Sequence, residues 1–304
     1  MNATFLNERA PLFHHITALH GDEGQKWLDA LPSQIQALSQ RWRLHDLAPV
    51  SNMTYHCVLT GFKDQRPIVL KIGFAHLMQE ITALKAFADK GAPLVYDAIP
   101  HAFFMERACP GTSLRALFPY DDMVATDHFC QVYRTLHGTI PPPTGTFPPL
   151  DGWLGALSKA YPAIPHSLLE KARVLSQRLL ETTKTPTLLH GDLHHDNILE
   201  HSNTWMMIDP KGVQGDPLYD IAPFMRNPFP ELFLSPSPLA IIERRFEHLT
   251  RTLALDPNRL LAWLFVDAIL SWIWCLEDHL DAAHACTYAH LIWDKAVHIN
   301  HIPA

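Results

Sequence analysis

The residues whose types and spacing best suggest chemistry lie between positions 188 and 209, which read LLHGDLHHDNILEHSNTWMMID. Asp192 follows His190 by two positions and precedes Asn197 by five, and Asp209 ends the next short apolar run. Phosphoryl transfer requires a carboxylate that orients the acceptor hydroxyl, together with metal ligands and cations that hold the phosphates. Carboxylate and amide oxygens are hard ligands that suit Mg²⁺. The segment therefore predicts Asp192 as the acceptor-orienting base, with Asn197 and Asp209 as magnesium ligands.

The same segment offers an alternative, a zinc site built from His190, Asp192, His194 and His195. A catalytic zinc ion typically takes three protein ligands and keeps one open position. The adjacent His194 and His195 would point in different directions on a strand or loop. Because phosphoryl transfer also accounts for the amide and the second carboxylate, the sequence favours it over zinc chemistry.

The nucleotide side of such a reaction is suggested by Lys71, which lies in the strand-like run VLKI and resembles the strand-borne lysine of kinases that contacts phosphates. Glu80 follows nine positions later and, at helical spacing, shares a face with Leu84 and Phe87. An unpaired carboxylate on an inward face would be costly. We therefore expect a buried Lys71–Glu80 pair rather than two surface charges, with Lys85 as the alternative lysine on the solvent side.

The expected phosphate loop, PVSNMTYH, contains no glycine. A glycine-rich loop lets backbone N–H groups approach phosphate closely. Here the side chains of Ser51, Asn52 and Thr54 are expected to take that role. By the same resemblance to kinases, the backbone of Glu106 and Ala108, in the segment FMERA, is expected to contact the adenine. The missing glycine leaves the choice between ATP and GTP open.

Two regions of different element content must position these residues. The first is predicted to contain a helix at 23–42 with a kink at Pro32, strands at 47–50, 55–60, 67–72, 94–99 and 103–107, and a helix at 78–87. The second is predicted to contain helices at 114–118, 127–136, 167–181, 239–253, 258–276 and 279–297, with strands at 188–190 and 205–208. We expect a nucleotide-binding lobe at 1–107, a catalytic and substrate lobe at 108–304, and an active site between them.

Two motifs connect the chain with a known family: HGDLHHDNIL at 190–199 and IDPKGVQGDPLYDIA at 208–222. They resemble the aminoglycoside phosphotransferase superfamily, and most of all its streptomycin 6-kinase and hydroxyurea kinase branch. The likeness runs over the whole length, including WLDALP at 27–32 and RLLAWLFVDAILSWIWCLED at 259–278. A lone His-x-Asp is common by chance, whereas this combination of motifs is specific.

The resemblance implies an α+β protein-kinase-like fold, with a β-rich N-terminal lobe and a mainly helical C-terminal lobe. It also implies Mg²⁺-dependent transfer of the ATP γ-phosphate to a hydroxyl of a streptomycin-like aminoglycoside. His190 would brace the loop that carries Asp192. Either Asp220 or Asp216 would anchor that loop through hydrogen bonds.

The acceptor is expected in the helical lobe, where carboxylates flanked by tryptophans would suit a cationic or sugar substrate. The candidates are Asp151, Trp153, Trp272, Trp274, Glu277 and Asp278. The competing interpretation of the last four is a core helix that ends at a solvated acidic turn.

Composition limits the other possibilities. The 304 residues are 47% hydrophobic and 18% charged with a net charge of -7, which suits a globular enzyme and disfavours a nucleic-acid partner. Five cysteines without a CxxC pair argue against a disulfide framework and favour a reducing compartment.

The apolar run 260–276 contains Asp267 and is too short for a full membrane span. We therefore expect a core helix, no membrane partner and a cytoplasmic protein. Monomer and dimer stay open.

Three other functions are weighed against the leading hypothesis. The acceptor could be a metabolite such as a sugar or an amino alcohol. A non-catalytic nucleotide-binding pseudokinase is favoured only by the glycine-free loop. A protein kinase is disfavoured because the short stretch between Val213 and Pro228 leaves little room for an activation segment.

Overall fold

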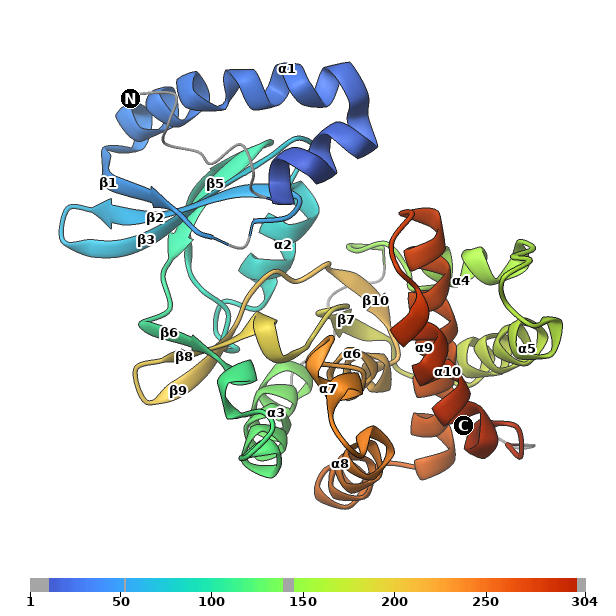
Figure 1. Ribbon diagram of the computed structural model, residues 1–304. Helices are drawn as coiled ribbons and strands as arrows, with labels where there is room; N and C mark the ends of the chain where they lie inside the picture. Colours follow the sequence, from blue (N-terminus) through green and yellow to red (C-terminus); the bar gives the residue numbers. More distant parts are fainter. Residues whose placement is uncertain (1–10, 52, 139–144, 300–304) are drawn as a thin grey trace. The chain divides into compact units, whose positions relative to one another are not determined.

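A five-stranded antiparallel sheet forms the centre of the first of two units in the computed structural model, which describes residues 11–51, 53–138 and 145–299 (Figure 1). The strands are β1 (Leu44–Pro49), β2 (His56–Lys63), β3 (Arg66–Gly73), β4 (Val95–Ile99) and β5 (Ala102–Glu106). Their spatial order is β1-β2-β3-β5-β4. The first unit comprises residues 1–88 and 92–109, and the second comprises residues 89–91 and 110–304.

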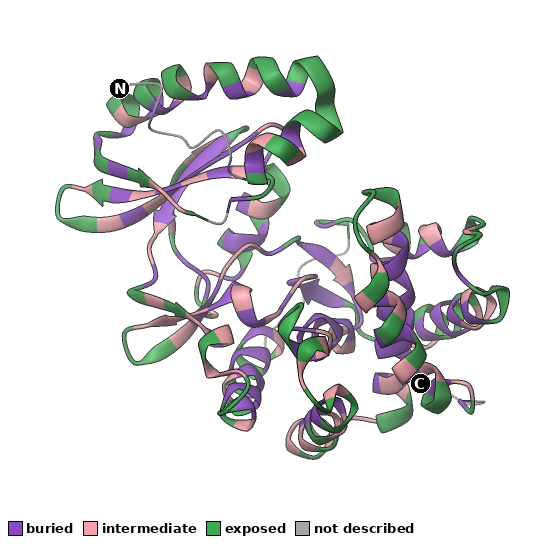
Figure 2. Cartoon of the chain, viewed as in Figure 1, coloured by how far each residue is buried: buried purple, intermediate pink, exposed green. Residues whose placement is uncertain are grey.

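One face of this sheet is covered by α1 (Pro11–Trp42), which is longer than the predicted helix. Ile68, Leu70 and Ile72 alternate along β3 and share a buried core with apolar residues of α1. Buried positions recur along α1 between exposed ones, as Figure 2 shows.

Pro32, the residue considered for a kink, is not where this helix is interrupted. The helix is interrupted at Gly21, whose φ of 52° and ψ of -133° are non-helical, whereas Pro32 lies inside a continuous segment. Glycine adopts positive φ without a steric penalty, so the chain turns there. The residues on both sides of Pro32, Leu31 and Ile35, are buried and keep that part of the helix packed.

The helix α2 (Met78–Ala86) is the second helix of the first unit. It buries Ile81, Ala83 and Leu84, and it carries Glu80 in its first turn. The sequence predicted this helix to within one residue at its end.

The second unit is mainly helical, with two small antiparallel sheets. Its helices are α3 (Asp122–His137), α4 (Asp151–Leu154), α5 (His166–Thr182), α6 (Ala222–Met225), α7 (Glu231–Leu234), α8 (Pro238–Leu253), α9 (Pro257–Glu277) and α10 (Ala283–Ala296). Its sheets have the strand orders β10-β7 and β6-β8-β9, formed by β6 (Pro110–Ser113), β7 (Thr187–Leu189), β8 (Ile198–His201), β9 (Thr204–Met207) and β10 (Val213–Gly215). Short 3₁₀ helices lie at Leu114–Leu117, Gly155–Ser158, His195–Asn197 and Pro217–Ile221. The predicted helix at 114–118 is one of these short turns.

The sequence did not predict β6, β8, β10, α4, α6 or α7. Each spans only three or four residues, which is too short for a hydrophobic period to be visible.

The core of the second unit is organised around α9, which contacts both α5 and α10. Its length and composition would allow it to cross a membrane, but 67% of its most apolar window is buried inside the protein. It is therefore a core helix, as predicted, and Figure 2 shows its buried surface. Asp256 caps it by accepting a hydrogen bond from the backbone N–H of Arg259 at 2.7 Å.

Candidate active site

The loop that carries Asp192 runs from the end of β7 to the start of β8, and Asp220 anchors its first residues. The buried Asp220 carboxylate accepts hydrogen bonds from the backbone N–H of His190 at 2.8 Å and of Gly191 at 2.6 Å. His137 lies 3.1 Å from the same carboxylate through Nε2. A carboxylate that accepts backbone N–H bonds makes strong, charge-assisted contacts. Asp220 therefore fixes the backbone immediately before Asp192.

The structure separates Asp220 from Asp216, which the sequence could not do. Asp216 accepts a hydrogen bond from the backbone of Leu218 at 3.0 Å, and its other oxygen accepts from Arg259 and from Trp263, each at 2.8 Å. Asp216 thus connects its own turn with α9 rather than with the catalytic loop.

The ring of His190 is buried and connects this loop with the strand that precedes Asp209. Nε2 lies 2.7 Å from the carbonyl of Ile208, and Nδ1 accepts a hydrogen bond from the backbone N–H of Asp192 at 3.2 Å. These two contacts require the neutral tautomer with the proton on Nε2. Burial lowers the pKa of His190, in agreement with a neutral ring.

Three cationic or titratable groups surround the carboxylate of Asp192. Lys211 Nζ is 3.7 Å from Oδ2, while His194 Nε2 and an Arg226 guanidinium nitrogen are 3.7 and 3.9 Å from Oδ1. Burial raises the pKa of Asp192, but these groups together outweigh burial and hold its pKa well below the ordinary value. Asp192 is therefore an ionised carboxylate that can accept a hydrogen bond from an acceptor hydroxyl.

The two expected magnesium ligands are brought together by the hairpin of β8 and β9. Ile198 pairs with Met207, and the backbone N–H of Ile208 donates to the carbonyl of Asn197 at 2.9 Å. The side-chain nitrogen of Asn197 donates to the backbone carbonyl of Asp192 at 2.8 Å, so its side-chain oxygen is the atom that can ligate a cation. Asp209 has a φ of 60°, which is uncommon for a residue with a side chain. One amide oxygen and one carboxylate form a donor set that suits Mg²⁺.

The zinc alternative finds no support in the described part of the chain, where no three His, Cys, Asp or Glu side chains form a group that could hold a metal ion. His195 is buried, and its ring stacks on Phe224 with a centroid distance of 4.4 Å. His194 accepts a hydrogen bond from the backbone of Asp196. Both rings therefore have contacts within the loop and its surroundings.

Two arginines that the sequence did not single out support the far end of the loop. Arg115 binds both oxygens of Asp196 at 2.6 Å and also pairs with Glu231. Arg245 is buried, donates to Asp122 at 3.1 Å and lies beside His195. These partners are more than 80 positions apart or lie on different elements, so no local pattern could have revealed them.

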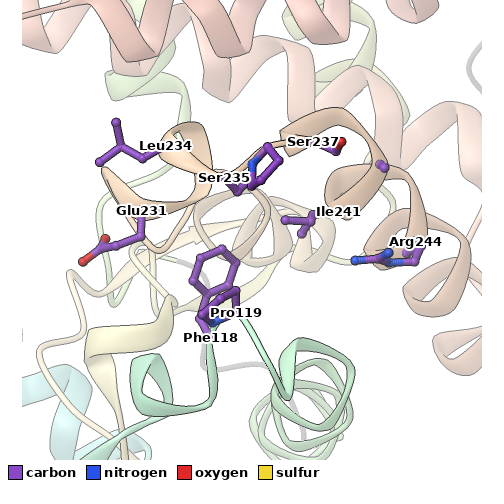
Figure 3. A pocket seen from close by; sticks show the side chains of 10 residues that line it. Phe118, Pro119, Glu231, Leu234, Ser235, Ser237, Ile241 and Arg244 are labelled. Atoms are coloured by element: carbon purple, nitrogen blue, oxygen red, sulfur yellow. The ribbon is translucent and has the colours of Figure 1, made fainter.

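A hollow of about 480 Å³ in the second unit contains none of the predicted site residues. Figure 3 shows Phe118 and Ile241 facing its interior, with Glu231 and Arg244 on opposite sides. Because Glu231 pairs with Arg115, this hollow borders the support of the catalytic loop rather than Asp192 itself.

In the first unit, Lys71 and Glu80 form the expected pair. Lys71 is 2% exposed, and its Nζ donates to Glu80 Oε1 at 2.8 Å. Lys85 is exposed, as expected.

The other nucleotide candidates lie at strand ends of the same unit. Ser51 and Thr54 are exposed between β1 and β2, and Asn52 lies outside the described residues. The backbone N–H of Glu106 donates to the carbonyl of Leu94 at 2.9 Å. Because this donor is used, the expected contact of Glu106 with adenine would have to use its carbonyl. Ala108 is buried.

The acceptor candidates differ in their surroundings. Trp272 is 5% exposed, and its ring packs against His290. Glu277 accepts hydrogen bonds from Lys159 at 3.0 Å and Tyr161 at 2.8 Å, and these donors lower its pKa. Asp278 is exposed at the end of α9. Trp272 thus belongs to the core, while Glu277 has a polar surface environment.

Trp153 lies against the catalytic loop, and Trp274 packs against Trp153. A Cβ atom added to Gly191, which has a φ of 82°, would lie 2.8 Å from the ring of Trp153. Trp153 meets Trp274 edge to face at a centroid distance of 5.9 Å. Asp151 is exposed two positions before Trp153 on α4. Trp153 is therefore the tryptophan that contacts the loop carrying Asp192.

The β-rich unit carries a lysine on a strand, Lys71, paired with Glu80. The helical unit carries two aspartates and one asparagine, Asp192, Asn197 and Asp209. Together they define a small-molecule kinase of protein-kinase-like fold. The model of the aminoglycoside/hydroxyurea antibiotic resistance kinase family matches residues 52–279, and the chain belongs to that family. A streptomycin 3''-kinase from Klebsiella pneumoniae is 30% identical over 250 residues, covering 79% of this chain and 91% of the relative. A streptomycin 6-kinase from Streptomyces glaucescens is 27% identical over 281 residues, covering 88% of this chain and 90% of the relative.

Solved structures support the same fold. A thermostable mutant of the aminoglycoside phosphotransferase APH(4)-Ia, in ternary complex with ADP and hygromycin B, matches with a TM-score of 0.65 at 15% identity, covering 88% of this chain and 99% of that one. A choline kinase from Streptococcus pneumoniae matches with a TM-score of 0.60 at 14% identity, covering 88% of this chain and 99% of that one.

Proposed function

We propose that this protein transfers the γ-phosphate of ATP, in the presence of Mg²⁺, to a hydroxyl of a streptomycin-like aminoglycoside. The observation that carries the proposal is the joint anchoring of Asp192, Asn197 and Asp209 by one loop and one hairpin. The names of the curated relatives, streptomycin 3''-kinase and streptomycin 6-kinase, support this acceptor class. Those names refer to different hydroxyls, so the proposal leaves the hydroxyl open.

In the proposed reaction, Asp192 accepts a hydrogen bond from the acceptor hydroxyl and takes its proton as the new bond to phosphorus forms. The bond between the γ-phosphorus and the bridging oxygen breaks, and ADP leaves. Lys71, held by Glu80, would hold the nucleotide phosphates. Bound to Asn197 and Asp209, Mg²⁺ would neutralise charge on the phosphates during transfer.

The composition fits this acceptor and a cytoplasmic location. The net charge of -7 favours approach of a cationic substrate. The five cysteines contain no CxxC pair, which favours a reducing compartment.

A coupled ADP-release assay over aminoglycosides, sugars and amino alcohols tests the proposal. We expect streptomycin-dependent ADP release by the wild type and none by a folded Asp192→Ala variant. Turnover of another acceptor class alone would reassign the protein to metabolite phosphorylation, which the shared fold with a choline kinase makes a specific alternative. Stabilisation by ATP and Mg²⁺ without turnover on any acceptor would support a pseudokinase instead.

A further inference from the structure

The buried carboxylate of Asp267 has no role in the reaction described above. It lies in the middle of α9 between the buried Val266 and Ala268, and it is fully inaccessible to solvent. A buried carboxylate is costly unless it is paired and hydrogen-bonded. A helix that needed only a packed core would have an apolar residue at this position.

The partner of Asp267 is Arg226, at the end of α6. Arg226 Nε donates to Asp267 Oδ2 at 2.9 Å, and the hydroxyl of Tyr219 lies 3.4 Å from Oδ1. Burial raises the pKa of Asp267, and the Arg226 charge opposes that effect. The Arg226 guanidinium is therefore held inside the core through its Nε atom.

A terminal nitrogen of the same guanidinium lies near the catalytic carboxylate. A terminal nitrogen of Arg226 lies 3.9 Å from Asp192 Oδ1, beyond hydrogen-bond distance but close enough for strong electrostatic attraction. The guanidinium is a rigid plane, so the bond at Nε determines where its terminal nitrogens lie. Asp267 thus controls how near the positive charge comes to Asp192.

We propose that Asp267 and Arg226 are positioning residues for Asp192, with Asp267 holding Arg226 beside the catalytic carboxylate without direct pairing. The role rests on the proposed kinase function. Without Arg226, the Asp192 carboxylate loses one of the two groups beside Oδ1 and keeps only His194 there. Without Asp267, Arg226 is released to form a direct ion pair with Asp192, which competes with the acceptor hydroxyl for the same oxygen.

Steady-state kinetics and urea unfolding of three variants test this role. Asp267→Asn and Arg226→Met should each lower kcat about 10- to 100-fold, with the KM for ATP within about twofold of the wild type. The double variant Asp267→Leu with Arg226→Met removes both buried charges, so its urea midpoint should exceed those of the single variants. Its kcat should nevertheless stay low, because the charge of Arg226 beside Oδ1 is absent.

Asp216→Asn is the matched control, because Asp216 also bonds to α9 but does not approach Asp192. It should lower the urea midpoint and leave kcat of the folded protein unchanged. Wild-type kcat in the double variant, or losses in the single variants that follow only their folded fraction, would overturn the proposal.

An activity-independent cycle separates this proposal from the kinase function. In the protein without ligands, urea midpoints are measured for Asp267→Asn, Asp192→Asn and their combination. The combined shift should exceed the sum of the single shifts, because Arg226 then loses both of its carboxylates. The urea-midpoint shifts of Asp216→Asn and Asp192→Asn should be additive when the two substitutions are combined. If the shifts in urea midpoint are additive in both cycles, the proposal is refuted, even for a protein that phosphorylates no acceptor. Absence of turnover refutes only the kinase function.

Discussion

Replacement of Asp220 by asparagine tests the central physical claim about the catalytic loop. Asp220 uses both oxygens, one for the backbone N–H of Gly191 and the other for that of His190. Asparagine retains one acceptor oxygen without charge and turns an NH₂ group towards the other backbone donor. One strong hydrogen bond is weakened, and one buried N–H group is left unsatisfied.

The magnitude follows from these two losses. A hydrogen bond to a charged group contributes about 1.5–3 kcal/mol, and a buried unsatisfied donor costs about 1–3 kcal/mol. We therefore expect Asp220→Asn to lower the free energy of unfolding by roughly 2–5 kcal/mol. Since Asp192 follows this anchored backbone directly, a displacement of about 1 Å would lower kcat by roughly 100-fold.

The assay combines urea unfolding with kcat measured where the variant is fully folded. Asp216→Asn provides the control, since this carboxylate is also buried but bonds to Arg259 and Trp263 instead of the loop. It should lose stability and keep its kcat. If Asp220→Asn retained wild-type kcat, or if both variants lost kcat equally, the anchoring argument would be refuted.

Three further predictions concern the surroundings of the loop. Arg245→Met leaves the buried Asp122 without its partner and should lower the free energy of unfolding by about 3–5 kcal/mol, measured by urea titration; a loss below about 1 kcal/mol would contradict the burial argument. Burial, with Arg245 nearby, holds the pKa of His195 well below 6.5, so the unfolded chain protonates first as pH falls. Stability should then decrease by up to about 1.4 kcal/mol per pH unit below about pH 6.5, and His195→Gln should flatten this slope in chelator-treated protein. Gly191→Ala places a methyl group at positive φ and 2.8 Å from the Trp153 ring; we expect lower thermal stability and lower kcat, and unchanged values of both would show that Trp153 does not pack on the loop.

The sequence was most informative where chemistry is local. Asp192, Asn197 and Asp209 lie within 18 positions of one another, so their spacing alone predicted a common site. Lys71 and Glu80 were also predictable, because a strand followed by a helix of known phase determines which side chains face each other.

The supporting contacts could not be read from spacing because they form only when distant elements pack. Arg226 meets Asp267 from 41 positions away. Asp267 was visible in the sequence as the single charge in an apolar run, but the run did not reveal what it pairs with. The sequence also did not show which face of α9 is buried. In the structure this helix buries Trp272 and leaves Trp274 partly exposed.

The origin of the contacts around Asp192 has a consequence for the thermodynamics of ligand binding. The described hydrogen bonds that fix the catalytic loop, from Asp220, Ser113 and Arg115, all come from the second unit. The loop is therefore ordered when that unit folds, before any ligand arrives. Little conformational entropy should remain to be lost there on binding. Amide hydrogen exchange at His190 and Gly191 should accordingly be as slow in the free protein as in a ternary complex.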